Sequence, residues 1–193
     1  MTQPNPLAIG ILALAGALAC ADSEVTPLGA PQLVLSEMAL GGAERVAERM
    51  ATDVRFGQTV MSGIASGDSL WLEVARQLPI RSAAAAASFD IALAGALPHE
   101  PERVLELAES KTQVERVCGM PFLNATLERV TSYYDSATAA LSSARAPSLL
   151  PAVRACGAAL DSARARKLSR IDPAYMVKNK PAPAKAPPRR RSR

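Results

Sequence analysis

The chain is poor in the residues from which most catalytic sites are built. It has one His among 193 residues, and this His99 lies between Pro98 and Glu100. Since a nucleophile is usually activated by a positioned His, a single one leaves little basis for such a pair. Residue 103 is Arg, so His99 and Glu100 do not begin an H-E-x-x-H zinc motif, and G-x-S-x-G, Walker and G-x-G-x-x-G patterns are missing. These absences favour binding over catalysis.

Aromatic residues are also scarce. Three Phe, three Tyr and one Trp make up 4% of the chain, so a core has to come from Leu, Val, Ile and Ala. Ala is the best helix former, and the residues typical of strands are not enriched. At this length the chain has room for one domain with flexible ends. We therefore predict an all-α fold, a compact bundle of about five to seven helices.

The positive charge of the chain is concentrated at its end. The net charge is +4, yet residues 178–193 hold seven basic side chains and no acidic one. The preceding 177 residues carry 15 basic and 18 acidic side chains, a balance of −3. The pI of about 9.2 therefore describes the tail, and the rest of the chain does not have the charge of a nucleic-acid-binding domain.

Residues 7–21 form an uncharged apolar run that is followed directly by Asp22. Fifteen residues are too few to cross a ~30 Å hydrocarbon core comfortably, but they have the length of a secretory signal. Small residues at 17 and 19, and at 19 and 21, provide cleavage sites, although residues 1–6 lack Lys and Arg. We predict that 1–21 is a signal peptide or membrane leader and that the protein is periplasmic or secreted. A retained membrane anchor and a buried helix of a cytosolic fold are the alternatives.

Cys20 is a candidate for lipidation. A bacterial lipobox has Leu, a small residue, Gly or Ala, and then the acylated Cys. Here Leu18 stands one place too close to Cys20. The alternative is a Cys inside a peptide that is discarded on export.

The other two cysteines are Cys118 and Cys156. An even pair in an oxidising compartment predicts a disulfide, and closing a loop of about 39 residues would stabilise the fold by roughly 4 kcal/mol. Both lie at apolar positions of helical patterns, so two buried free thiols are the alternative. Without further Cys or clustered His they do not form a zinc site, and we expect no metal and no cofactor.

The pattern of apolar residues divides the rest of the chain. Residues 22–42 contain turn signals and no sustained period, which indicates an irregular lead-in. Residues 43–170 show helical periodicity and form the predicted domain. Asp68, Ser148 and either Asn124 or Thr126 are the predicted helix caps. The predicted helices cover residues 43–64, 69–78, 82–97, 101–118, 126–141 and 148–163, and the last two should pair as antiparallel neighbours.

Residues 171–193 are rich in Pro, Ala and Arg and are predicted to be a disordered tail. Its basic side chains would bind an anionic polymer through counterion release. In a cell envelope the partner would be anionic lipid, lipopolysaccharide or wall polymer; nucleic acid would be the partner in a cytosol, and a solubilising tail is the alternative. The candidate contacts are Lys178, Lys180, Lys185, Arg189, Arg190, Arg191 and Arg193.

Two carboxylate pairs and one Trp are candidates for catalytic or sugar-binding groups. Glu44 and Glu48, and Glu102 and Glu106, stand one helical turn apart with Arg nearby, which is typical of a solvated helix face. Asp68 beside Trp71 could line a sugar site, but a helix cap next to a core Trp is the simpler interpretation. We predict no catalytic residue.

Several short motifs resemble those of a group of small exported proteobacterial proteins. They are a Trp-Leu-x-x-Ala helix, an Ala-Leu-Pro-x-x-Pro-x-x-Val-Leu turn, a Val-Cys-x-x-Pro-Phe segment and a later Cys. In this chain they begin at Trp71, Ala96 and Val117, and the later Cys is Cys156. The resemblance covers about residues 68–160. It implies export and a Cys118–Cys156 bridge, and it implies no particular activity.

Together these observations predict an exported, disulfide-bridged helical domain that acts by binding an unidentified protein or an anionic envelope polymer. The alternatives are a lipoprotein anchored through Cys20, a wall-active hydrolase, and nucleic-acid binding through the tail.

Overall fold

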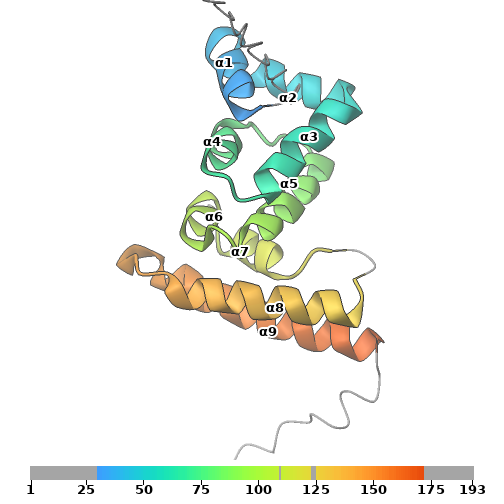
Figure 1. The fold of residues 1–193 in the computed structure, drawn as a ribbon, viewed down its shortest axis with the longest axis vertical. Helices are drawn as coiled ribbons and strands as arrows, with labels where there is room; N and C mark the ends of the chain where they lie inside the picture. The colour runs from blue at the N-terminus through green and yellow to red at the C-terminus, as the bar shows by residue number, and fades with distance from the viewer. Residues whose placement is uncertain (1–29, 109, 123–124, 172–193) are drawn as a thin grey trace, which may run out of the picture.

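The computed structural model describes residues 30–108, 110–122 and 125–171, and over these ranges every regular element is helical (Figure 1). The all-α prediction is confirmed. The predicted leader with Cys20, and the basic tail beyond residue 171, lie outside the described residues. In chain order the helices are α1 (Pro31–Gly41), α2 (Ala43–Thr52), α3 (Val54–Ala65), α4 (Ser69–Gln77), α5 (Ala83–Ala96), α6 (Pro101–Leu107), α7 (Lys111–Cys118), α8 (Leu127–Ser143), the 3₁₀ turn η1 (Pro147–Leu149) and α9 (Leu150–Ile171).

The first seven helices stack in two columns. Helices α2, α3, α5 and α7 contact one another in succession, and α1, α4 and α6 do the same beside them. The antiparallel pair of α8 and α9 closes one end of the stack, where α7 packs on α9 and α6 on α8 (Figure 1). The predicted pairing of the last two helices is confirmed.

The lead-in is more ordered than the sequence indicated. We expected residues 22–42 to be irregular, but Pro31–Gly41 is helix α1. It buries only Val34 and Met38, and two inward residues over three turns are too few to establish a period. Pro31 occupies the first turn, where its missing N–H costs nothing.

Two of the six predicted helices are each divided by a polar cap, which together with α1 gives the nine α-helices of the described residues, more than the five to seven predicted. At Asp53 the backbone is extended, and its carboxylate accepts a hydrogen bond from the Phe56 N–H at 3.0 Å, which starts α3. Ser110 similarly accepts from the Gln113 N–H at 3.2 Å and starts α7. The apolar pattern of residues 43–64 and that of residues 101–118 therefore each run across the boundary between two helices.

The other predicted caps largely agree with the structure. Asp68 accepts from the Leu70 and Trp71 N–H groups at 3.0 and 3.2 Å, and Thr126, not Asn124, caps α8. Ser82, where a predicted helix begins, caps α5. Ser148 was the wrong choice, because it lies inside η1, which leads directly into α9.

The core is aliphatic, as the shortage of aromatic residues requires. Its largest fully buried side chains include Ile64, Leu93, Leu97, Leu160 and Leu168. The disulfide Cys118–Cys156 fastens α7 to α9, with Cα atoms 5.2 Å apart and both residues fully buried. This bridge ties the two-column stack to the α8–α9 pair.

Candidate functional site

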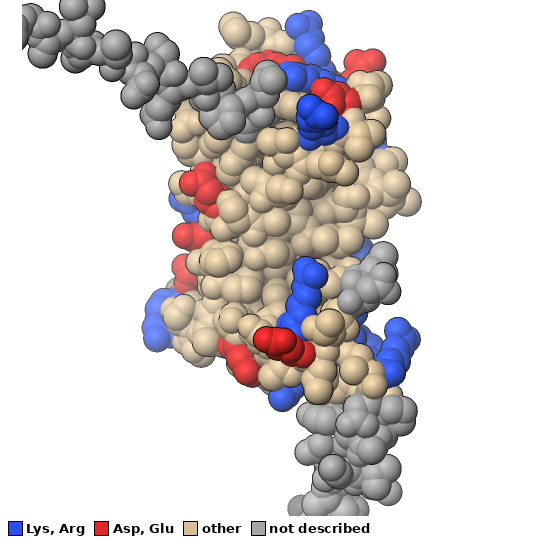
Figure 2. All heavy atoms as spheres, turned by 45° about the vertical axis from the view of Figure 1, so that its right-hand side comes forward, with Lys and Arg blue, Asp and Glu red and all other residues tan. Residues whose placement is uncertain are grey.

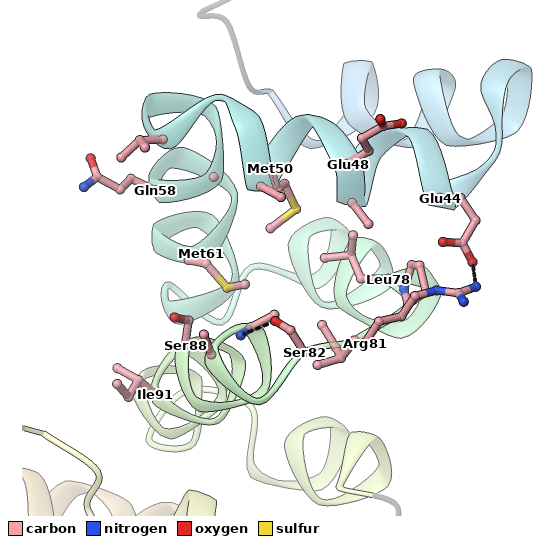
Figure 3. A pocket seen from close by; sticks show the side chains of 18 residues that line it. Glu44, Glu48, Met50, Gln58, Met61, Leu78, Arg81, Ser82, Ser88 and Ile91 are labelled. Carbon is pink, nitrogen blue, oxygen red and sulfur yellow. Dashed lines mark hydrogen bonds and ion pairs between the residues drawn. The ribbon is translucent and has the colours of Figure 1, made fainter.

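A groove of about 860 Å³ lies between α2, α3, α5 and the segment 78–82 (Figure 3). We call it the α2/α5 groove. Its volume is within the range of about 300–1,000 Å³ that is typical of ligand sites, and such sites are mostly apolar. The nonpolar residues that line it are Ala47, Met50, Ala51, Val54, Gly57, Met61, Leu78, Pro79, Ile80, Ala84, Ala85 and Ile91.

Two methionines approach the groove from different walls. Met50 comes from α2 and Met61 from α3, and both side chains point into the space between the helices (Figure 3). Both are only partly buried. Unbranched thioether side chains adapt their shape to what they contact, so this surface can fit more than one apolar ligand.

The charged residues that line the groove are mainly acidic. Glu44 and Glu48 stand one turn apart on α2, and Arg81 is the one cationic side chain among the lining residues. Arg81 is paired with Glu44, whereas Glu48 makes no ion pair with another residue of the described ranges. The rim therefore carries an excess of one negative charge.

The groove owes its shape to the sequence between α4 and α5. Pro79 follows the end of α4, and Ile80 contributes to the apolar lining. The Ser82 hydroxyl then accepts from the Ala85 N–H at 3.1 Å and sets the start of α5. The first turns of α5 present Ala84 and Ala85 to the groove, and these short side chains leave it open.

The sequence did not reveal this groove, because apolar residues of two helices, α2 and α3, fit the period of a single helix. We assigned Met50, Val54, Gly57 and Met61 to the buried face of a single helix, yet these four residues line the groove and the Val54 side chain is 69% exposed. The core face of α3 is Phe56, Val60 and Ile64 instead. The sequence of α3 therefore holds two sets of apolar residues at helical spacing, and only one set is needed for the core. The second set was the signal that could have revealed the groove.

The face that carries α3 and α5 has few charges near its middle. Figure 2 shows charged side chains toward the two ends of the molecule and along its left edge, with uncharged residues over most of the region between. Ile91, which lines the groove, is 39% exposed. Exposed apolar patches on a folded protein often mark places where a partner binds, and the lining of the groove is largely apolar.

A second, smaller cavity of about 490 Å³ is polar and includes Asp90 and Arg116. Asp90 is 4% exposed, and one of its oxygens accepts from the Arg116 Nε–H at 2.6 Å. Its other oxygen has no hydrogen-bond partner among the described residues. The pair joins α5 to α7, and we assign it a structural role.

The predicted candidate residues do not converge on a catalytic site. His99 is exposed in the α5–α6 turn, and Trp71 is packed against α3; neither lines the groove or the second cavity. Asp68 serves as the cap of α4, which confirms the simpler interpretation. Glu44 and Glu48 are both exposed, as predicted for a solvated helix face, and they also line the groove.

The Glu102 carboxylate is hydrogen-bonded to backbone N–H groups. Its carboxylate accepts hydrogen bonds from the N–H groups of Arg145 and Ala146, the latter at 3.0 Å. These two bonds lower the pKa of Glu102 and tie α6 to the turn after α8. Glu106, its predicted partner, lines the second cavity instead.

Within the described ranges, no three His, Cys, Asp or Glu side chains are grouped so that they could hold a metal ion. No helix there has the length and apolar character needed to cross a membrane. No protein-family model matches the chain, and comparisons with curated proteins and with solved structures gave no match. The resemblance to exported proteobacterial proteins therefore stays a prediction, and the geometry of the groove has to carry the functional argument.

Proposed function

We propose that this protein is an exported binding protein that holds an apolar ligand or an apolar part of a partner in the α2/α5 groove. The observation that carries the proposal is the groove itself, a volume of about 860 Å³ with a largely nonpolar lining and two adaptable methionines. The scarcity of catalytic groups supports binding rather than a wall-active hydrolase.

The binding part of the proposal is tested with a neutral apolar dye, N-phenyl-1-naphthylamine, whose fluorescence rises in a nonpolar site. Ala84→Trp places an indole in the groove, because Ala84 is exposed and lines it. Ala87→Trp is the matched control, since Ala87 is exposed on the same helix and lies outside the lining. We expect at least a tenfold loss of dye affinity in the first variant and little change in the second. Equal affinities would overturn the proposal.

Export is supported by the apolar run of residues 7–21 and by a bridged cysteine pair, since disulfides persist in oxidising compartments. The mass of the intact protein from its native host tests this. A chain that begins at Asp22 and lacks two hydrogens is expected. Added acyl mass on Cys20 would favour a lipoprotein, and an intact Met1 with free thiols would contradict export.

The basic tail is proposed as an auxiliary contact with an anionic envelope polymer. Seven basic side chains without an acidic one in residues 178–193 support this role. Binding to anionic vesicles should weaken steeply with salt and be lost when residues 178–193 are removed. Vesicle binding that persists without these residues would argue against the tail.

A further inference from the structure

We propose that the α2/α5 groove receives a basic amphipathic helix of a partner protein. This inference rests on the proposed function and adds to it the chemistry of the occupant. It follows from three properties of the groove: its length, the size of the side chains along it, and its charge.

The groove has the length of about two helical turns. On α2 its lining runs from Glu44 to Ala51, and on α5 from Ala84 to Ile91. At 1.5 Å per residue each of these segments extends for about 10 Å. Figure 3 shows α2 and α5 on opposite sides of the groove, with α3 crossing at one end. A helix lying in such a groove contacts it with apolar residues at positions i, i+3, i+4 and i+7.

The side chains along the groove leave room for those of a partner. Ala47 and Ala51 on α2 and Ala84 and Ala85 on α5 are short, so a helix backbone can approach closely while its larger side chains fill the space. Met50 and Met61 lie between these walls (Figure 3). Their adaptability suits the irregular surface that the apolar face of a helix presents.

The charges at the rim select a basic partner. Glu44 and Glu48 lie on one wall, and Arg81 is engaged by Glu44. Of the two cations of α2, Arg49 is bound to Glu37 at 2.8 Å and lies over the Phe56 ring, and the Arg45 guanidinium lies against Gly41, so neither forms an ion pair with Glu48. A Lys or Arg on the flank of the docked helix would pair with Glu48, whereas an acidic flank would be repelled.

The test uses the full chain with its disulfide intact and three synthetic 18-residue peptides. The first has Leu at i, i+3, i+4 and i+7 with Lys elsewhere, the second has Glu in place of Lys, and the third is a scrambled version of the first. Binding is measured by fluorescence anisotropy at about 50 and 300 mM salt. We expect the basic amphipathic peptide to bind at least tenfold more tightly than either of the others.

Matched variants assign the binding to the groove. Ala84→Trp should weaken the basic peptide at least tenfold, and Ser88→Trp, another exposed lining position, should do the same. Ala87→Trp should leave its affinity unchanged. Glu48→Gln should weaken it about two- to fivefold and reduce its salt dependence, because an exposed ion pair contributes modestly and is screened. Glu115→Gln on α7 is the charge control.

The outcomes separate this inference from the proposed function. Dye binding that Ala84→Trp blocks, without peptide binding, would overturn the basic helix and leave the apolar groove in place. Equal binding of acidic and basic peptides, with both weakened by Ala84→Trp, would also overturn it, whereas acidic-peptide binding that Ala84→Trp leaves unchanged would belong to the basic tail and not to the groove. Self-association abolished by Ala84→Trp in analytical ultracentrifugation would assign the groove to a second copy of the chain. Absence of both dye and peptide binding would remove both proposals.

Discussion

The Tyr133 hydroxyl donates a hydrogen bond to the Ala94 carbonyl at 2.8 Å, in place of the donor that α5 lacks. In a continuing helix this carbonyl would accept from residue 98, but residue 98 is a proline and has no N–H. A side chain of α8 thus completes the end of α5. The ring of Tyr133 is also held edge-on by Phe122, with centroids 4.8 Å apart, and burial raises the pKa of its hydroxyl.

Tyr133→Phe should destabilise the fold because it leaves a buried carbonyl without a donor. We expect a loss of about 1–2 kcal/mol in the free energy of unfolding, measured by urea denaturation. Tyr134→Phe is the matched control on the same helix, since its hydroxyl bonds the more exposed Asp161 at 2.6 Å. Its loss should be smaller than about 1 kcal/mol. Equal losses in the two variants would show that the Ala94 carbonyl finds another partner.

Gly63→Ala should be destabilising even though Ala is the better helix former. A Cβ at residue 63 would lie 2.3 Å from Cε2 of Trp71, so the indole that packs on α3 would have to move. Overpacking of this kind costs about 1–3 kcal/mol, which exceeds the ~1 kcal/mol gained in helix propensity. In α9, a Cβ at Gly157 meets no atom within 4 Å, so Gly157→Ala should stabilise by about 0.5–1 kcal/mol. Thermal unfolding of the two variants should therefore shift in opposite directions.

Removal of the Cys118–Cys156 bridge should loosen the attachment of α9 to α7. Replacing both cysteines by Ala is expected to lower the free energy of unfolding by about 3–4 kcal/mol, because the unfolded chain gains the freedom of the opened loop. A thiol titration of the denatured exported chain, beginning at Asp22, checks the starting state: no free thiol is expected before reduction and two after it. A reductant should lower the thermal midpoint of the wild type and leave that of the double variant unchanged. Two thiols before reduction would contradict the bridge.

Local signals in the sequence predicted the helices well where a cap and an apolar period agreed. Asp68 and Ser82 both start helices, as their positions before an apolar run indicated. The cysteine pair was correctly matched because only two cysteines remain after the leader. Periodicity failed at Asp53, where an apolar pattern runs across an extended residue and two helices change direction. Because the apolar pattern does not change at Asp53, the sequence alone does not show that the chain turns there and that a new helix begins.

The groove depends on tertiary packing and was beyond a reading of single helices. Met50 and Met61 look like core residues in the sequence, since their spacing continues the apolar pattern of residues 43–64. They line an open surface because the chain turns at Asp53 and α3 then packs Phe56, Val60 and Ile64 into the core. The orientation of a helix pair, rather than the composition of either helix, decides which apolar residues stay accessible.

Glu102 should make the stability of the fold depend on pH in the acid range. Backbone hydrogen bonds from Arg145 and Ala146 hold the pKa of its carboxyl below the ordinary value of 4.5. Its stabilising contribution is therefore fully present above about pH 4.5 and is lost as the pH falls through the folded-state pKa. Glu102→Gln lacks this contribution, so the gap in unfolding free energy between wild type and variant should be largest near neutral pH and shrink toward pH ~2–3.

Urea denaturation at a series of pH values from about 7 to 2.5 measures this gap. Glu115→Gln is the control, because its carboxylate makes only a 3.9 Å contact with Lys111 on the exposed side of α7. It reports what any replacement of Glu by Gln does to the pH curve. A Glu102→Gln gap that stays constant across the series would mean that the link between α6 and the turn after α8 does not depend on the charge of Glu102. A gap that closes in acid would place that link in the ionised carboxylate and its two backbone donors.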